Sequence, residues 1–283
     1  MRQLLPREEY VEQAYLFKAL AERSSEGEPV QSLLKFLRQE ILATTKLPMA
    51  IDYLLAELNH VGAMSTAMRG LSHYFTAFQS FIIGAAENVR GRFDIQTALK
   101  VLEHEASFRA DNDSAAALFF YQFETLCRNR LEYDHGLVAM SHDPFYDETW
   151  QRWIANIQHK IGIIDIADLV YVHSYYYVIR QSKESPADTE SPDPVLFDEK
   201  EGRIALANRT KEPLFFFSAL QRQLNYPEVP RPKRRDENED IIPKLLRTVQ
   251  QLETRLKLLE DEQRGKGIDL SQFFEKPGSA DRP

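Results

Sequence analysis

The sequence has a single cysteine among its 283 residues, so an internal disulfide is excluded. Cys127 lies among Phe123, Leu126 and Leu131 at helical spacing, which favours a small buried apolar side chain over a reactive thiol. Long apolar runs are also missing, since stretches such as 81–86 are far shorter than the roughly 20 residues that span a bilayer. The first residues contain no apolar core of a signal peptide. We therefore expect a protein of the reducing cytoplasm with no membrane partner.

Several motifs of catalysis and cofactor binding are absent as well. The sequence contains no GxGxxG, no GxxxxGK followed by Ser or Thr, no serine-centred nucleophile elbow and no CxxC pair. A formal net charge of -8 disfavours nucleic acid as a partner, because its phosphates would be repelled unless one face were locally basic. The basic cluster at 231–235 is followed at once by acids at 236–240, which is typical of a solvated linker. These absences favour a protein without a cofactor, without enzymatic activity and without a nucleic-acid partner.

The residues that are present favour a helical first half. With 43% apolar residues, the chain can form a sizeable core. From about residue 7 to 137, apolar residues recur at helical spacing with short connections, which predicts an antiparallel bundle or stacked helical hairpins. Pro29 and Pro48 mark two helix starts, because proline is tolerated in a first turn. The expected helices carry, in order, Val11 and Leu20, Leu33 and Leu37, Leu54 and Leu58, Phe78 and Ile82, Leu99 and Leu102, and Phe119 and Phe123 on their apolar faces.

A boundary is expected near residues 138–144, because the residue before Pro144 is pushed away from helical backbone angles. A helix with Trp150 and Trp153 on its apolar face follows, and it leads into a stretch of different composition. Residues Leu169–Ile179 are β-branched or aromatic on both alternating faces, which predicts a strand covered on both sides. A buried helix over the same residues is the alternative.

Two more strands are predicted at 195–200 and 203–207, because Gly202 between them suits a tight antiparallel turn. Pro213 then begins a helix whose apolar face would cover this three-stranded sheet. The apolar surface of the region exceeds what so small a sheet covers. We therefore expect residues 143–226 to pack against the helical first half.

The last quarter of the sequence carries a coiled-coil pattern. Three prolines followed by charged residues predict a linker over 227–240. Beyond it, apolar residues alternate at spacings of three and four, with Leu at every d position and β-branched residues at the first two a positions, which favours a parallel homodimer. The alternative is a seam that folds back on its own chain, because three heptads are marginal as an isolated helix. The seam consists of Ile242, Leu245, Val249, Leu252, Leu256 and Leu259.

Two Glu-x-x-His pairs suggest a different function. Glu57 with His60, and Glu132 with His135, each place a carboxylate and an imidazole on one helical face. Di-iron or di-manganese bundles use this spacing on two helices, with one more Glu from each of two others. Such pairs also arise by chance in a chain rich in Glu, where they are surface charges. The candidates for the two further metal ligands are Glu40 and Glu87, or Glu103.

His173 lies among tyrosines, with Asp165 and Asp168 ahead of it. This arrangement would suit a general base, but a core histidine bonded to a hydroxyl or a backbone group is the favoured interpretation. The two acids are expected to cap or turn the segment.

The sequence thus predicts a mainly α protein, and we expect a non-enzymatic interaction or scaffolding protein that forms a homodimer and binds protein partners. The alternative is a di-metal carboxylate protein that holds iron or manganese. The predicted divisions are a helical bundle over 1–137, a small α+β module with a short antiparallel sheet over 143–226, a linker over 227–240, a C-terminal coiled-coil helix over 241–264 and a flexible tail over 265–283.

Overall fold

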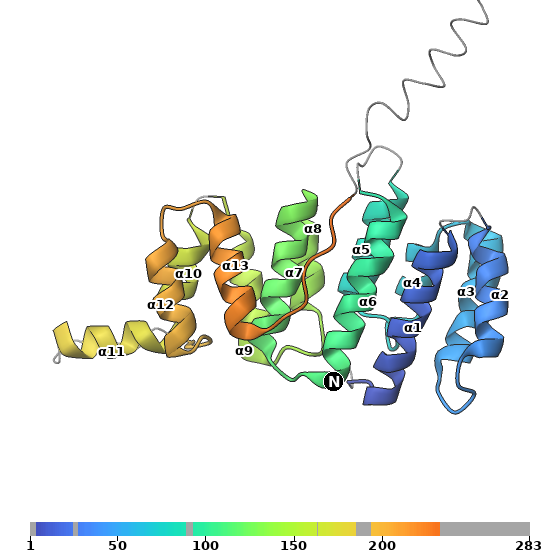
Figure 1. Cartoon of the computed structure of the whole chain (residues 1–283), viewed down its shortest axis with the longest axis horizontal. Helices are drawn as coiled ribbons and strands as arrows, with labels where there is room; N and C mark the ends of the chain where they lie inside the picture. The colour runs from blue at the N-terminus through green and yellow to red at the C-terminus, as the bar shows by residue number, and fades with distance from the viewer. Residues whose placement is uncertain (1–3, 25–27, 89–92, 163, 185–193, 233–283) are drawn as a thin grey trace, which may run out of the picture. The chain divides into compact units, whose positions relative to one another are not determined.

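The computed structural model describes residues 4–24, 28–88, 93–162, 164–184 and 194–232 (Figure 1). Within these ranges the chain forms thirteen α-helices and no strand, apart from two isolated single-residue bridges. Residues 1–232 belong to one compact unit. The predicted coiled coil over 241–264, with its six seam residues, and the predicted tail over 265–283 lie outside the described residues. The prediction of a mainly α protein is confirmed.

The helical first half follows the sequence pattern closely. Pro29 directly precedes one helix and Pro48 lies in the first turn of the next, as expected. Thr76, Asp94 and Ser114 begin three others, each with a side-chain oxygen that accepts from a backbone N–H of the first turn. The helices are α1 (Arg7–Ser24), α2 (Val30–Glu40), α3 (Leu47–Val61), α4 (Met64–Gly70), α5 (Ala77–Glu87), α6 (Ile95–Asp111) and α7 (Ala115–Asn129).

Short α4 was not predicted, and a side chain from another helix stabilises its start. The Glu87 carboxylate at the end of α5 accepts from the backbone N–H groups of Met64, at 2.5 Å, and Ser65, at 3.2 Å. It therefore satisfies two N–H groups that the first turn of a helix leaves unpaired. The same carboxylate accepts from the Ser65 hydroxyl at 2.5 Å.

The second half is helical too. Pro213 begins its last helix, as predicted. Helix α8 was not predicted, and it is only nine residues long. The remaining helices are α8 (Tyr133–Ser141), α9 (Glu148–Gln158), α10 (Ile166–Val172), α11 (Tyr175–Glu184), α12 (Glu199–Asn208) and α13 (Pro213–Leu224).

The predicted three-stranded sheet is wrong. Residues Leu169–Ile179 form the end of α10 and the start of α11, and residues 203–207 lie inside α12. Asp165 accepts from the N–H of Ala167 and starts α10, so local capping and tertiary packing override the β propensity of the sequence. Gly202 is not a turn residue. A Cβ at this helical position would collide with the side chain of Ser174, so glycine allows α12 to approach the α10–α11 elbow.

Many helices pack against their neighbours along the chain, and others pair over longer separations, among them α5 with α8 and α7 with α13. Helices α2 with α3, α4 with α5, α8 with α9, and α12 with α13 are in contact, whereas α1 packs along α6 (Figure 1). The second half packs on the first, as expected. Trp153 of α9 lies 5.0 Å from Phe119 of α7 between ring centroids, and Phe217 of α13 lies 6.0 Å from Phe123. The division of this unit into separate parts over 1–137 and 143–226 stays a prediction.

Candidate functional site

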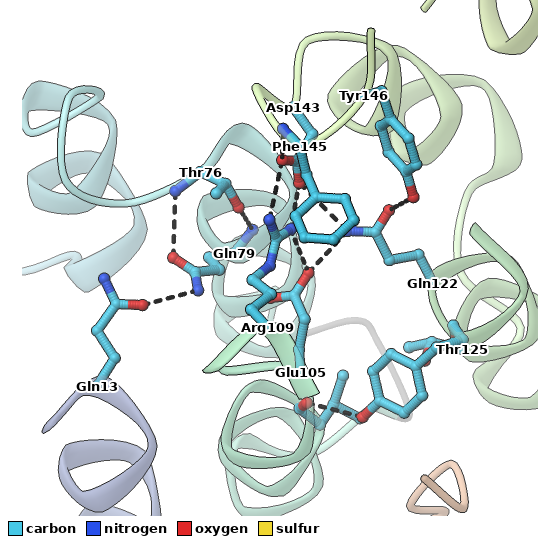
Figure 2. A network of polar contacts seen from close by, with 12 residues as sticks. Gln13, Thr76, Gln79, Glu105, Arg109, Gln122, Thr125, Asp143, Phe145 and Tyr146 are labelled. Atoms are coloured by element: carbon cyan, nitrogen blue, oxygen red, sulfur yellow. Dashed lines mark hydrogen bonds and ion pairs between the residues drawn. The ribbon is translucent and has the colours of Figure 1, made fainter. Parts of the chain in front are cut away.

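Three charged side chains form a cluster whose members are 0% exposed, at the junction of α6, α7 and the α8–α9 loop (Figure 2). Arg109 donates through Nη1 to Asp143 Oδ1 at 3.0 Å and through Nη2 to Glu105 Oε1 at 3.0 Å. Its Nη2 also contacts Asp143 Oδ2. We call Glu105, Arg109 and Asp143 the ion cluster. It joins the loop that follows α8 to the C-terminal part of α6.

Polar side chains extend the ion cluster into α7 and the loop. Gln122 donates from Nε2 to Glu105 Oε1 at 2.7 Å, and the Tyr146 hydroxyl donates to Gln122 Oε1 at 2.7 Å (Figure 2). Burial, with the Asp143 carboxylate nearby, raises the pKa of Tyr146 well above its ordinary value, so this hydroxyl stays protonated and keeps donating. Two atoms, Glu105 Oε2 and Arg109 Nε, have no hydrogen-bond partner among the described residues.

The charge state of the ion cluster fits a structural role. Burial alone lowers the pKa of Arg109, but the carboxylates of Asp143 and Glu105 raise it well above the ordinary value, so the guanidinium remains charged. Because none of the three side chains is exposed, a substrate would have no contact with them. Removing one member of such a cluster leaves a buried charge without compensation. The ion cluster is therefore a clamp between helices.

A second polar group joins α1 to the start of α5. Gln79 donates from Nε2 to Gln13 Oε1 at 3.2 Å (Figure 2). Gln13 donates to the backbone oxygen of Tyr74 at 3.1 Å. The Tyr74 hydroxyl donates to Glu9 at 2.8 Å. Burial and this carboxylate raise the pKa of Tyr74, so the hydroxyl remains a donor. These contacts fix α1 to the α4–α5 connection.

An extended segment follows α13 and returns to α6 and α7. We call residues 225–232 the strap; Figure 1 shows it in orange to red, running from α13 past α7. Tyr226 is 3% exposed and Val229 is 2% exposed, so two side chains three residues apart are inserted into the body. The Tyr226 hydroxyl donates to Glu124 Oε2 of α7 at 2.7 Å. The linker prediction is therefore wrong for residues 227–232, which are part of the folded unit.

Side chains of the body hold the strap by its backbone. His104 Nδ1 of α6 lies 2.9 Å from the backbone oxygen of Glu228, and Asn129 Nδ2 of α7 donates to the backbone oxygen of Pro230 at 3.2 Å. Prolines at 227, 230 and 232 leave few N–H groups in the strap, so its carbonyl groups carry these contacts. An open cleft beside the strap is lined by Lys100, Glu103, His104 and residues 228–231. The body thus binds a short extended peptide, which is its own.

We define the strap groove as Lys100, Glu103 and His104 of α6 together with Glu124 and Asn129 of α7. Glu124 is buried and forms an ion pair with Arg128 one turn along α7. The acceptor for the Tyr226 hydroxyl is therefore a carboxylate that is held in place by a pair within α7, independently of the strap. Among the sites described, this groove is the candidate for recognition of a partner.

The four predicted metal ligands lie on α3 and α8. His135 and Glu132 are an exposed pair at the start of α8, with 2.7 Å between Nδ1 and Oε2. His60 is exposed near the end of α3, and Glu57 is half-buried one turn earlier. The structure does not bring the two pairs together, because no three His, Cys, Asp or Glu side chains in the described ranges form a group that would hold a metal ion.

The further metal candidates have other partners. Glu40 accepts from the Tyr15 hydroxyl at 2.8 Å and from Arg23 Nη2 at 2.9 Å, and Glu87 begins α4 as described above. Glu103 lines the cleft beside the strap. Glu40 and Glu87 therefore have structural contacts within the fold.

His173 lies at the elbow between α10 and α11, as a half-buried side chain. Its Nδ1 is 2.9 Å from the backbone oxygen of Pro194, and its ring meets the edge of Trp153 at 5.8 Å. Burial lowers the pKa of His173. The predicted bond to a backbone group is therefore present, although His173 is half-buried and not a fully buried core residue. Asp165 caps α10, and Asp168 pairs with Arg209 instead of acting as a second cap.

Cys127 is half-buried, and burial raises the pKa of its thiol to about 12. A thiol with so high a pKa is almost entirely protonated at neutral pH and is a poor nucleophile. This agrees with the interpretation of Cys127 as a packing residue.

The ion cluster and the strap groove were missed from the sequence, although one signal was present. Glu105 and Arg109 fall on the apolar stripe of α6 that includes Leu102 and Ala106, and a charge at such a position indicates a buried pair. Asp143 was noted only as the residue before Pro144. No pattern in the sequence indicated which helix the strap would contact.

No protein-family model, no curated protein and no solved structure matches this chain. In the part of the chain that the structure describes, no helix is both long enough and apolar enough to cross a bilayer.

Proposed function

We propose that this protein is a non-enzymatic interaction or scaffolding protein of the reducing cytoplasm, which forms a parallel homodimer through the segment 241–264. The observation that carries the proposal is the strap. It fixes the chain to α6 and α7 as far as Pro230, and the segment with the heptad pattern follows from residue 241. The helical body thus ends in a strap that is bound to α6 and α7, and the sequence beyond it is suited to a coiled coil between two chains.

The heptad pattern supports a dimer between chains for two reasons. Its register is unbroken, and a helix that folds back on its own domain rarely keeps a strict seven-residue repeat. Arg255 at a g position would face Glu260 at an e position of a parallel partner, which adds an attractive pair between chains.

The experiment that tests this proposal compares two substitutions that introduce the same charge two residues apart. Leu252→Glu places a carboxylate at a d position of the seam, whereas Thr254→Glu places the same group at the outward f position. We expect light scattering at micromolar concentration to give a dimer for the native chain and for Thr254→Glu, and a monomer for Leu252→Glu. A native chain that is a monomer would show that the seam folds back and that the proposed dimer is wrong.

A further inference from the structure

The strap leaves one buried acceptor of its groove without a hydrogen bond. Asn129 is 9% exposed, and no donor among the described residues reaches its Oδ1. Its Nδ2 donates to the backbone oxygens of Thr125, at 3.1 Å, and Pro230, at 3.2 Å. Two carbonyl acceptors on one side of the amide fix which atom is nitrogen, because a flipped amide would place oxygen against oxygen. The unpaired atom is therefore the amide oxygen.

A proline in the strap explains the missing donor. In an extended chain the N–H and C=O groups of one residue point to the same side, so a side-chain amide can pair with both. Asn129 pairs with the C=O of residue 230, but residue 230 is proline and has no N–H. A buried acceptor that stays unpaired loses its hydrogen bonds to water and gains none from the protein. The strap therefore fits its groove incompletely at this one position.

The other unpartnered buried atoms do not face a removable segment. Glu105 Oε2 and Arg109 Nε belong to the ion cluster, and Trp153 Nε1 lies on α9. Asn129 differs because the group it contacts across the groove belongs to the strap, which is held by few side chains.

We propose that the strap groove binds an extended segment of a partner protein, and that the chain's own strap is a displaceable occupant. The partner segment keeps the spacing of Tyr226 and Val229, with a tyrosine for Glu124 and a small β-branched side chain three residues later. At the position of Pro230 it carries a residue other than proline, whose N–H pairs with Asn129 Oδ1. This inference rests on the proposed interaction role and names the chemistry of the partner.

The test uses three labelled peptides of residues 225–232: the native sequence, Pro230→Ala and Pro227→Ala. They are titrated by fluorescence polarisation into the full chain carrying Val229→Asp, which removes the buried apolar side chain of its own strap. We expect the Pro230→Ala peptide to bind about fivefold more tightly than the native peptide, the effect of one net hydrogen bond. The Pro227→Ala peptide loses the same proline stiffness without a new donor at residue 230, so it should bind no more tightly than the native peptide.

Asn129→Ala in the same chain should abolish the advantage of the Pro230→Ala peptide. Equal binding of all three peptides, an advantage that survives in Asn129→Ala, or binding of none of them would each overturn the inference. Should Val229→Asp fail to fold, hydrogen exchange of residues 226–231 in the otherwise native chain answers the same question. Pro230→Ala should slow that exchange and Pro227→Ala should not, and equal exchange in both would overturn the inference.

Light scattering on the same native chain separates the two proposals. A dimer with no preference for the Pro230→Ala peptide overturns the inference and leaves the proposed function standing. A monomer that shows the preference overturns the dimer and leaves the groove as a recognition site.

Discussion

The ion cluster and the strap groove both use side chains of α6 and α7, but they hold their partners in different ways. In the ion cluster, a charged group from each side is buried and paired, so removing one partner would leave the other charge buried without compensation. In the strap groove, the side chains of His104 and Asn129 contact backbone oxygens of the strap, and one amide oxygen stays unpaired. The first contact is therefore a permanent clamp, and the second is suited to exchange.

The largest expected effect is the loss of the clamp. Arg109→Met keeps the length of the side chain but leaves Glu105 and Asp143 buried without a cation. We expect the free energy of unfolding to fall by about 3–5 kcal/mol, measured by urea denaturation. Arg7→Met is the control, because Arg7 and Asp111 are 67% and 61% exposed and such a pair contributes at most about 1 kcal/mol. Equal losses in the two variants would contradict the role of the ion cluster.

A smaller effect is expected at the strap. Tyr226→Phe removes the hydroxyl that donates to the buried Glu124, and should lower the free energy of unfolding by about 1.5–3 kcal/mol, the range for a hydrogen bond to a charged group. Tyr15→Phe provides the comparison, since its hydroxyl donates to an exposed carboxylate, Glu40, at a similar distance. We expect that change to stay within about 0.5 kcal/mol. If Tyr226→Phe lowered the free energy of unfolding by no more than Tyr15→Phe does, the Tyr226 hydroxyl would not anchor the strap as described.

The elbow at His173 gives a pH-dependent effect in a direction that follows from burial. Since burial lowers the pKa of His173, the folded protein binds this proton less readily than the unfolded chain does, whose value is 6.5. Neutral His173 therefore contributes to the free energy of unfolding above pH 6.5. This contribution is lost as the pH falls through 6.5 toward the lower pKa of the folded state. We expect the loss in stability between neutral and mildly acidic pH to be smaller in His173→Gln. The exposed His135→Gln should behave like the native chain, and identical pH dependence in all three would contradict the prediction.

No measurable change is expected at the Glu-x-x-His pairs. The structure keeps Glu57 and His60 on α3 and Glu132 and His135 on α8, with no group of metal ligands in the described ranges. Protein purified without chelator should therefore contain no stoichiometric iron or manganese, and His60→Ala should leave its metal content unchanged. Bound iron or manganese that disappears in His60→Ala would restore the di-metal alternative.

Sequence periodicity predicted the longer helices of the first half but not α4, because the longer helices have long apolar stripes and most of their starts carry proline or a capping residue. It failed at Leu169–Ile179, where the composition of a buried strand and that of a buried helix are the same on both faces. In the folded protein, α12 approaches the α10–α11 elbow closely, and Gly202 permits this packing of the helical form. Such a contact between distant residues is not visible in a local sequence pattern.

The sites were less predictable than the fold. The Glu-x-x-His pairs follow a local spacing, yet their helices pack against other neighbours. Arg109 pairs with Asp143, and Asn129 donates to the backbone oxygen of Pro230. Both partners lie far from these residues in the sequence. Neither partner follows from helical periodicity, because periodicity reports which face of a helix is buried and not what covers it.

The central claim is that this chain works as a paired scaffold, and the most direct measurement is its mass in solution with and without the residues beyond 232. We predict by light scattering at micromolar concentration that the full chain has twice the mass of one copy, while residues 1–232, which end after the strap, have the mass of one. A full chain with the mass of a single copy, or a dimer that persists in residues 1–232, would contradict the account.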